Sequence, residues 1–397
     1  MRDALEMVAD LATLRYPGFV YGRELRGREL PVFILHGVEP EAFGRLLRFL
    51  AANRYHTLTV SELEAFVRGH SPALPDRSIV LTFDDGMASV WTSAFPLLRK
   101  HGFRATVFLI PGKIREGGEP RPTLEDVLVG RARAEDVGDE DRGPEPLATW
   151  REIETMAAAG LIEFESHTLH HALVFTGPRL TGFVTPEALR RYHPFEFSFA
   201  HLFEDSNVGG VTPPPLGTPI YASSPRCAAE RRFLDDPRLR EACIGLVESQ
   251  GGEAFFREDG WRSELPRFVG TWRAQHGSRE HYETPEERHR ALLRELRVSK
   301  ERIEERLGRP VRHLCYPWGL GSELAARLSR EVGYRTNLWA KVGGRLTNRR
   351  GDDPYRISRV GSDFLAVLPG EQRTTLARLI VGKLRRRAQG GSAYLSH

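Results

Sequence analysis

Buried-strand patterns and helical patterns alternate along most of the chain. Unbroken apolar and β-branched runs are typical of strands covered on both faces, and they lie within 30–38, 78–83 and 104–114. Further strand patterns lie at 161–171 and 311–319. Segments with apolar residues at helical spacing lie between them, at 40–55, 93–103, 149–160 and 284–308. This order of elements predicts an α/β fold built from parallel strands.

Two shorter segments continue the alternation. Residues 57–69 open with strand-like residues, and Ser61 and Glu64 then have the spacing of a capping box, so we expect a helix to start there. Residues 322–339 have the pattern of a helix followed by a strand. The core is therefore expected to be a multi-unit α/β barrel or sheet.

One region breaks the alternation. Between 174 and 283 the chain becomes rich in proline, aromatic and irregular segments, which predicts an inserted, mostly helical or irregular subdomain. Its aromatic residues are expected to form mainly its own core. The predicted domains are an extension (1–30), a barrel in two parts (31–173 and 284–365), the insertion (174–283) and a basic tail (366–397).

Acidic and imidazole side chains stand at the predicted strand ends. Asp84 and Asp85 follow a buried strand directly, where α/β folds keep their chemistry, although Asp-Gly is also common in simple turns. His167 and His171 are four residues apart, so a helical turn would direct both imidazoles one way. Two imidazoles and one carboxylate suit a divalent ion, and the second carboxylate could then act as a base.

Composition narrows the class of protein. The chain has 397 residues, 40% of them hydrophobic, with a formal net charge of +4 that gives little support for nucleic-acid binding. Three widely spaced cysteines fit reduced thiols better than a disulfide framework. We see no secretory signal and no run long enough to span a membrane, so we expect a cytoplasmic protein.

Three short motifs carry a resemblance to a known family. TFDDG (82–86), HTLHH (167–171) and YPWG (316–319), in this order, resemble the leading motifs of the polysaccharide deacetylases, the NodB homology domain or carbohydrate esterase family four. The resemblance covers roughly 31–172 and 284–365 and implies a distorted (β/α) barrel of about seven units. It also implies metal-dependent removal of an acyl group, usually acetyl, from the nitrogen of an amino sugar.

The same resemblance assigns roles to individual residues. It implies a general base, Asp84; three metal ligands, Asp85, His167 and His171; an oxyanion-binding backbone N–H, that of Trp318; and substrate contacts from Tyr316 and Arg359. The expected cofactor is a divalent ion, zinc first, with cobalt, nickel or iron as alternatives.

Two departures from the family pattern affect the expected site. Many members have an arginine where this chain has Cys315, so Arg356 or Arg359 is expected to tune Asp84 instead. Many members also supply a general-acid histidine near the end of the domain, where this chain has none. The chain resembles the circularly rearranged poly-N-acetylglucosamine deacetylases, which take this histidine from an early strand, and His36 is the matching residue. An isolated histidine can also simply cap a strand, but we place the catalytic role ahead.

The substrate and partners stay open at this level. The leading hypothesis is deacetylation of an amino sugar in a polysaccharide, an oligosaccharide or a lipid- or nucleotide-linked precursor. The alternatives are an amidohydrolase acting on a cyclic or small-molecule amide and an inactive carbohydrate-binding relic. Residues 375–387 predict an amphipathic basic helix that could touch an anionic membrane surface, but packing on the barrel is the expected arrangement.

Overall fold

The computed structural model describes residues 7, 9–138, 141, 143, 145–191, 214–342 and 344–388. Its centre is a sheet of nine strands in which every neighbouring pair is parallel. The strands are β1 (Val32–Leu35), β2 (His56–Leu58), β3 (Ser78–Phe83), β4 (Ala105–Leu109), β5 (Ile162–Ser166), β10 (His313–Cys315), β11 (Thr336–Trp339), β12 (Ile357–Ser358) and β13 (Val360–Gly361).

The sheet curls into a nearly closed barrel. Its strand order is β12-β11-β10-β5-β4-β3-β1-β13, with β2 added beside β3. Only Arg359 separates β12 from β13, so the two ends of the path meet at one short segment of chain. The predicted distorted (β/α) barrel is confirmed, and the closing segment brings Arg359 to the barrel's interior.

Hydrophobic residues separate into a layer under the helices and a layer inside the barrel. Every residue of β3 is buried, as its unbroken apolar pattern predicts. Ile79 and Leu81 pack in the larger cluster, whereas Val80 packs with Phe108 and Cys315 in a second cluster. The covering helices are α2 (Pro40–Ala52), α4 (Phe95–His101), α6 (Trp150–Ala158), α10 (Pro285–Leu307) and α11 (Glu323–Val332).

Helix α3 (Val60–Val67) begins two residues earlier than the sequence indicated. Thr59 and Glu62 form its capping box, so the prediction of Ser61 and Glu64 is wrong. The hydroxyl of Ser61 instead bonds the carboxylate of Glu163 on β5. A contact made across 102 residues thus takes the side chain that local spacing had assigned to the cap.

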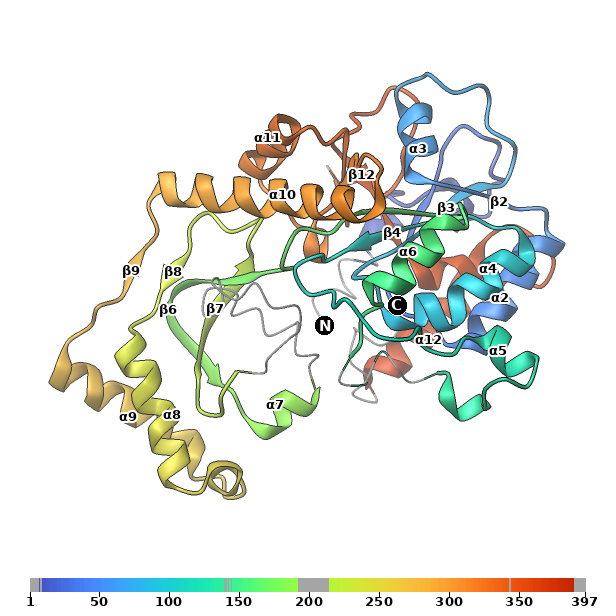
Figure 1. Ribbon diagram of the computed structural model, residues 1–397. Coiled ribbons are helices and arrows are strands. Elements are labelled where there is room, and N and C mark those ends of the chain that lie inside the picture. Colours follow the sequence, from blue (N-terminus) through green and yellow to red (C-terminus); the bar gives the residue numbers. More distant parts are fainter. Residues whose placement is uncertain are drawn as a thin grey trace.

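The region between β5 and α10 forms a separate body beside the barrel (Figure 1). Strands β6 (Leu173–Phe183) and β7 (Pro219–Pro225) pair antiparallel, as do the short β8 (Phe233–Leu234) and β9 (His281–Tyr282). Helices α8 (Pro237–Ser249) and α9 (Trp261–His276) pack with its aromatic residues in a cluster of their own. The predicted "mostly helical or irregular" subdomain is therefore an incomplete description, because the prediction did not include the antiparallel pair of β6 and β7. Part of this region, 192–213, lies outside the described residues.

The remaining short helices lie in loops and near the chain ends. They are η1 (Gly18–Tyr21), the π-helical η2 (Val90–Ala94), α5 (Leu124–Leu128), η3 (Ala134–Asp136), α7 (Pro186–Arg191), η7 (Gly252–Phe256), η8 (Pro317–Gly319) and η9 (Ser362–Val367). The last helix, α12 (Leu376–Ala388), packs on the barrel through Leu379, and Lys383 pairs with Asp363 of η9 at 2.9 Å. Across the described part of the chain, we find no helix with the length and apolar character needed to cross a membrane.

Candidate active site

The predicted chemical groups converge at the carboxyl ends of the barrel strands. Asp84 and Asp85 follow β3, and His167 follows β5. In the sheet, one strand, β4, lies between β3 and β5. Arg359 reaches the same place from the closing segment between β12 and β13. Parallel strands end at one rim of a barrel, so elements far apart in sequence supply one site.

Asp84 is buried and held by an arginine. The two Nη atoms of Arg359 donate to the two carboxylate oxygens of Asp84, at 2.7 and 2.9 Å, in a bidentate pair. Burial alone would raise the pKa of Asp84, but the charge and hydrogen bonds of Arg359, together with the charges of His167 and His36, outweigh it and hold that pKa well below its usual range. Asp84 is therefore a fully ionised carboxylate of fixed orientation.

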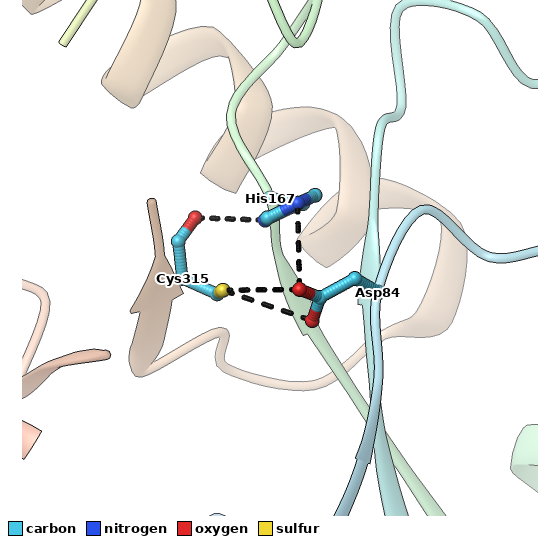
Figure 2. Close-up of side chains that lie close together, drawn as sticks. All are labelled: Asp84, His167 and Cys315. Carbon is cyan, nitrogen blue, oxygen red and sulfur yellow. Dashed lines mark hydrogen bonds and ion pairs between the residues drawn. The ribbon is translucent and has the colours of Figure 1, made fainter. Parts of the chain in front are cut away.

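Cys315 contributes a weak contact to the same carboxylate. Its Sγ donates to Asp84 Oδ1 and Oδ2 at 3.7 and 3.9 Å, while its carbonyl lies 2.9 Å from His167 Nδ1 (Figure 2). Of the two arginines that sequence offered for tuning Asp84, Arg359 takes the role, and Arg356 pairs with Glu323 at the surface.

Asp85, His167 and His171 form a compact donor set. The Oδ1 atom of Asp85 lies 3.6 Å from Nε2 of His167 and 3.5 Å from Nε2 of His171. Metal–ligand bonds of 2.0–2.1 Å in a tetrahedral site require ligand atoms roughly 3.4 Å apart, so these separations fit one divalent ion. Burial lowers the pKa of both imidazoles, most strongly for His171, which favours the neutral form that binds metal.

The two imidazoles converge through a loop rather than the helical turn that their spacing suggested. Thr168 and His171 have left-handed backbone angles, φ 68° and 53°, and Asp85 has φ 69°. The hydroxyl of Thr168 accepts a hydrogen bond from the backbone N–H of His171 at 3.2 Å. Strained positions of this kind persist where surrounding contacts fix them, and they often mark functional sites.

Glu295 makes contacts that fix this loop, and the sequence patterns did not predict them. This residue of α10 accepts the backbone N–H of His170 at 2.6 Å, and its other oxygen lies 2.9 Å from His170 Nδ1. Its side chain is buried, so the carboxylate ties the loop that carries His171 to a helix 125 residues away in sequence. One glutamate on a long amphipathic helix gives no local signal of this role.

Trp318 and His36 flank the donor set. The indole of Trp318 lies against the imidazole of His171, with ring centroids 4.1 Å apart, and Trp318 has a left-handed backbone, φ 54°. His36 follows β1 and is half-buried, and its charge would lower the pKa of both Asp84 and His171. Both residues predicted for catalysis thus lie at the same rim as Asp84.

The two predicted substrate contacts are placed differently from expectation. Tyr316 is fully buried, and its hydroxyl accepts a hydrogen bond from Asn337 Nδ2 at 2.9 Å, so its phenol belongs to the core rather than to a surface that a sugar can reach. Arg359 is 2% exposed, and its guanidinium is committed to Asp84. Its geometry is that of a residue that positions the carboxylate rather than one that contacts substrate.

Fold and site together define a (β/α) barrel protein with a carboxylate–imidazole centre at the strand ends. Residues 71–191 match the family model described as polysaccharide deacetylase. The chain is 28% identical over 131 residues to the poly-β-1,6-N-acetyl-D-glucosamine N-deacetylase of Escherichia coli (strain K12), covering 33% of this chain and 17% of that protein. It is 25% identical over 133 residues to the enzyme of the same name from Staphylococcus aureus (strain MSSA476), covering 34% and 37% respectively.

The chain therefore matches well under half the length of these relatives. Solved structures with a similar fold include the BpsB deacetylase domain from Bordetella bronchiseptica, at 18% identity and a TM-score of 0.49 over 84% of this chain and 96% of that one. IcaB from Ammonifex degensii aligns with 19% identity and a TM-score of 0.46, over 86% and 96%. The resemblance to poly-N-acetylglucosamine deacetylases that the motifs indicated is confirmed by the sequence matches.

Proposed function

We propose that the protein is a metal-dependent N-deacetylase that hydrolyses the acetamide of an amino sugar in a glycan. The observation that carries the proposal is one arrangement at the barrel rim. An ionised Asp84, fixed by Arg359, stands beside the Asp85, His167 and His171 donor set. The neighbouring carboxylates thus have separate tasks, with Asp85 as a ligand and Asp84 as a base.

The donor set suits a divalent ion, with zinc as the first expectation and cobalt, nickel or iron as alternatives. Such an ion, bound by Asp85, His167 and His171, would supply Lewis acidity for the attack of water on the amide carbonyl. The rest of the reaction falls to the chain itself.

Asp84 accepts a proton from the attacking water, whose oxygen forms a bond to the carbonyl carbon. Arg359 keeps the carboxylate ionised and aimed during this step. The backbone N–H of Trp318 is assigned to the developing oxyanion, because η8 lies beside His171. His36 donates a proton to the departing nitrogen as the C–N bond breaks, which leaves acetate and a free amine.

The substrate assignment follows from the relatives. Those named poly-β-1,6-N-acetyl-D-glucosamine N-deacetylases support an N-acetylglucosamine unit, in a polymer, an oligosaccharide or a lipid- or nucleotide-linked precursor. A small-molecule amidohydrolase remains the alternative activity, and a binding relic is disfavoured because Asp84, Asp85, His167 and His171 all converge. The cytoplasmic location stays a prediction.

The test is acetate release by the full chain after removal of metal and reloading with one ion at a time. We expect release from β-1,6-linked N-acetylglucosamine oligomers with zinc, cobalt or nickel, and none from the metal-free protein. Asp84→Asn serves as the matched control, since it differs by one atom type. Hydrolysis of a cyclic amide with no acetate release from any amino sugar would favour the alternative activity instead.

A further inference from the structure

A cavity of about 700 Å³ lies between α2, η9 and α12 and is called the α2–α12 groove below. This volume lies within the range of small-molecule sites, which run from about 300 to 1,000 Å³. None of the groups assigned to catalysis lines it. The deacetylase centre therefore does not explain the role of this groove.

The groove has an apolar floor. Ala42, Leu46 and Phe49 lie along one face of α2, and Leu365 of η9 and Leu379 of α12 complete the lining. Leu365 and Leu379 are buried, whereas Leu46 and Phe49 are half-buried, so part of this surface stays in contact with solvent. Such a surface favours a hydrocarbon chain, since burying apolar area gains roughly 25 cal/mol per Å².

Two arginines line the same groove, and its acidic groups already have partners. The Glu39 carboxylate accepts backbone N–H groups at the start of α2, and Asp363 pairs with Lys383 at 2.9 Å. Arg45 pairs with Glu41 at 3.3 Å, an exposed contact that is weak in water and the one ion pair it makes with described residues. Arg378 forms no ion pair with any residue that the structure describes.

The groove adjoins the candidate active site along two segments of chain. Leu35 and Gly37 line it and lie on either side of His36. Ser362 also lines it and follows Arg359 by three residues. A molecule held in the groove would therefore lie next to the rim at which the deacetylase centre is built.

We propose that the α2–α12 groove binds the hydrocarbon chain and phosphate of a lipid-linked amino sugar, with the chain on the apolar floor and the phosphate at Arg45 and Arg378. A single-chain lipid phosphate combines an apolar body with an anionic group, which matches the groove's two kinds of lining. This inference rests on the proposed function, because it names the carrier of the sugar that the centre would deacetylate.

The test measures binding without catalysis. Full-length protein is titrated calorimetrically with monomeric dodecyl phosphate, and separately with inorganic phosphate and with neutral dodecyl maltoside. We expect saturable binding of one dodecyl phosphate, on the order of tenfold or more tighter than either comparison ligand, because only it satisfies both linings. Arg378→Glu should weaken that binding at least about tenfold by replacing attraction with repulsion.

Control variants distinguish binding in the groove from a general effect of surface charge and from loss of folding. Arg327→Glu makes the same change at an exposed position of α11, and it should leave binding unchanged. Leu46→Asp places a charge on the floor and should also weaken binding, and melting curves check that each variant is folded. Because Arg378 is exposed and makes no ion pair with described residues, its variant is expected to melt like the wild type.

Three results would overturn the inference: equal binding of dodecyl maltoside, unchanged binding by Arg378→Glu, or binding to phosphatidylglycerol vesicles but not to monomeric dodecyl phosphate. The last would indicate a membrane-surface contact instead. The two proposals fail separately. Acetate release from chain-free oligomers without lipid phosphate binding sinks only the groove assignment, whereas lipid phosphate binding without any deacetylation sinks the proposed function.

Discussion

Among the residues that the structure describes, carboxylates and imidazoles gather at two depths of the barrel, and one of these clusters lies at the strand ends. The upper cluster is Asp85, His167 and His171, and the lower cluster is Glu163, Glu165 and His313. In each, one ligand-type atom per residue lies within 4.8 Å of the others. On β5, Glu163 and Glu165 precede His167 by four and two residues, and His313 lies on the neighbouring strand β10, so the two clusters share one strand and differ in depth.

The polar side chains of the lower cluster have hydrogen-bond partners within the protein. The ring of His313 is bonded at both nitrogens, to Ser61 Oγ at 2.9 Å and Thr336 Oγ1 at 2.8 Å. Glu163 accepts from Ser61 and from Thr106, and one oxygen of Glu165 accepts two backbone N–H groups at 2.7 Å. Buried polar groups that satisfy one another fix a core and leave few lone pairs for an ion.

The upper cluster is built differently. Its ligand-type atoms face one another at 3.5 to 3.6 Å, distances that suit a shared ion better than hydrogen bonds. Left-handed backbone at Asp85 and His171 turns those side chains toward one point. Residue types alone therefore do not tell the two clusters apart, because they differ in strand depth and in the hydrogen bonds that their polar atoms make.

The largest expected effect is loss of metal from the upper cluster. Asp85→Ala or His171→Ala should remove both bound metal and measurable activity, because a three-ligand site cannot spare a ligand. Glu163→Gln, the matched change in the lower cluster, should keep the full metal content. Elemental analysis of purified, zinc-reconstituted variants decides it, and metal loss from Glu163→Gln would contradict the distinction between the clusters.

The next effect is loss of turnover without loss of metal. Asp84→Asn should keep the ion and reduce kcat by about 10⁴, near the top of the range for a positioned base, since an amide cannot accept the proton. Glu165→Gln is the matched control and should leave kcat within about twofold, since it lies in the lower cluster. Metal content and kcat are measured on the same preparations. Equal metal loss in Asp84→Asn and Asp85→Ala would show that the two aspartates do not divide the roles.

A third prediction concerns the acid for the departing amine. His36→Ala should keep metal and fold while kcat falls on the order of 10² to 10⁴, the usual worth of a positioned acid. Because an imidazolium donor is lost as pH rises, the basic limb of the pH–rate profile should flatten in the variant. Near-normal turnover with an unchanged profile would assign the proton to another group and remove the main support for His36.

Local signals in the sequence predicted an α/β barrel or sheet and the residues of the upper cluster, and the family resemblance specified the distorted barrel. An unbroken apolar run marks the buried strand that Asp84 and Asp85 directly follow, and His167 and His171 come after the strand pattern that begins at 161. The distorted barrel is confirmed, and the four side chains do converge. The roles assigned to them stay predictions until variants are measured.

Side-chain contacts between elements far apart in the sequence could not be predicted from local patterns. Arg359 was expected either to contact substrate or, with Arg356 as the alternative, to tune Asp84, and it lies on Asp84 because the barrel closes at that residue, which no local pattern indicates. Glu295 supports the histidine loop from a helix 125 residues away. Ser61 was assigned to a helix cap, but its hydroxyl bonds Glu163. In each case a tertiary partner decided what the side chain does.

The smallest expected effect is a change in stability at the lower cluster. Burial lowers the pKa of His313 to about 4, although the charges of Glu163 and Glu64 raise it, and Arg312 and Arg335 lower it further. An unfolded histidine has a pKa of about 6.5, so between these values the unfolded chain takes up a proton that the folded chain does not. The contribution of neutral His313 is thus fully present above about pH 6.5 and is lost as pH falls toward 4.

His313→Gln removes this titration while retaining a donor and an acceptor for Ser61 and Thr336. Between pH 7 and pH 5 the free energy of unfolding should fall by about 2 kcal/mol more in the wild type than in the variant. Urea unfolding at the two pH values measures the difference, and metal content at pH 7 should be the same in both proteins. Parallel losses of stability would mean that His313 does not titrate on unfolding, whereas a loss of metal would mean that the lower cluster reaches the upper one. The predicted result would show that one barrel uses the same residue types for catalysis at its rim and for stability one layer beneath.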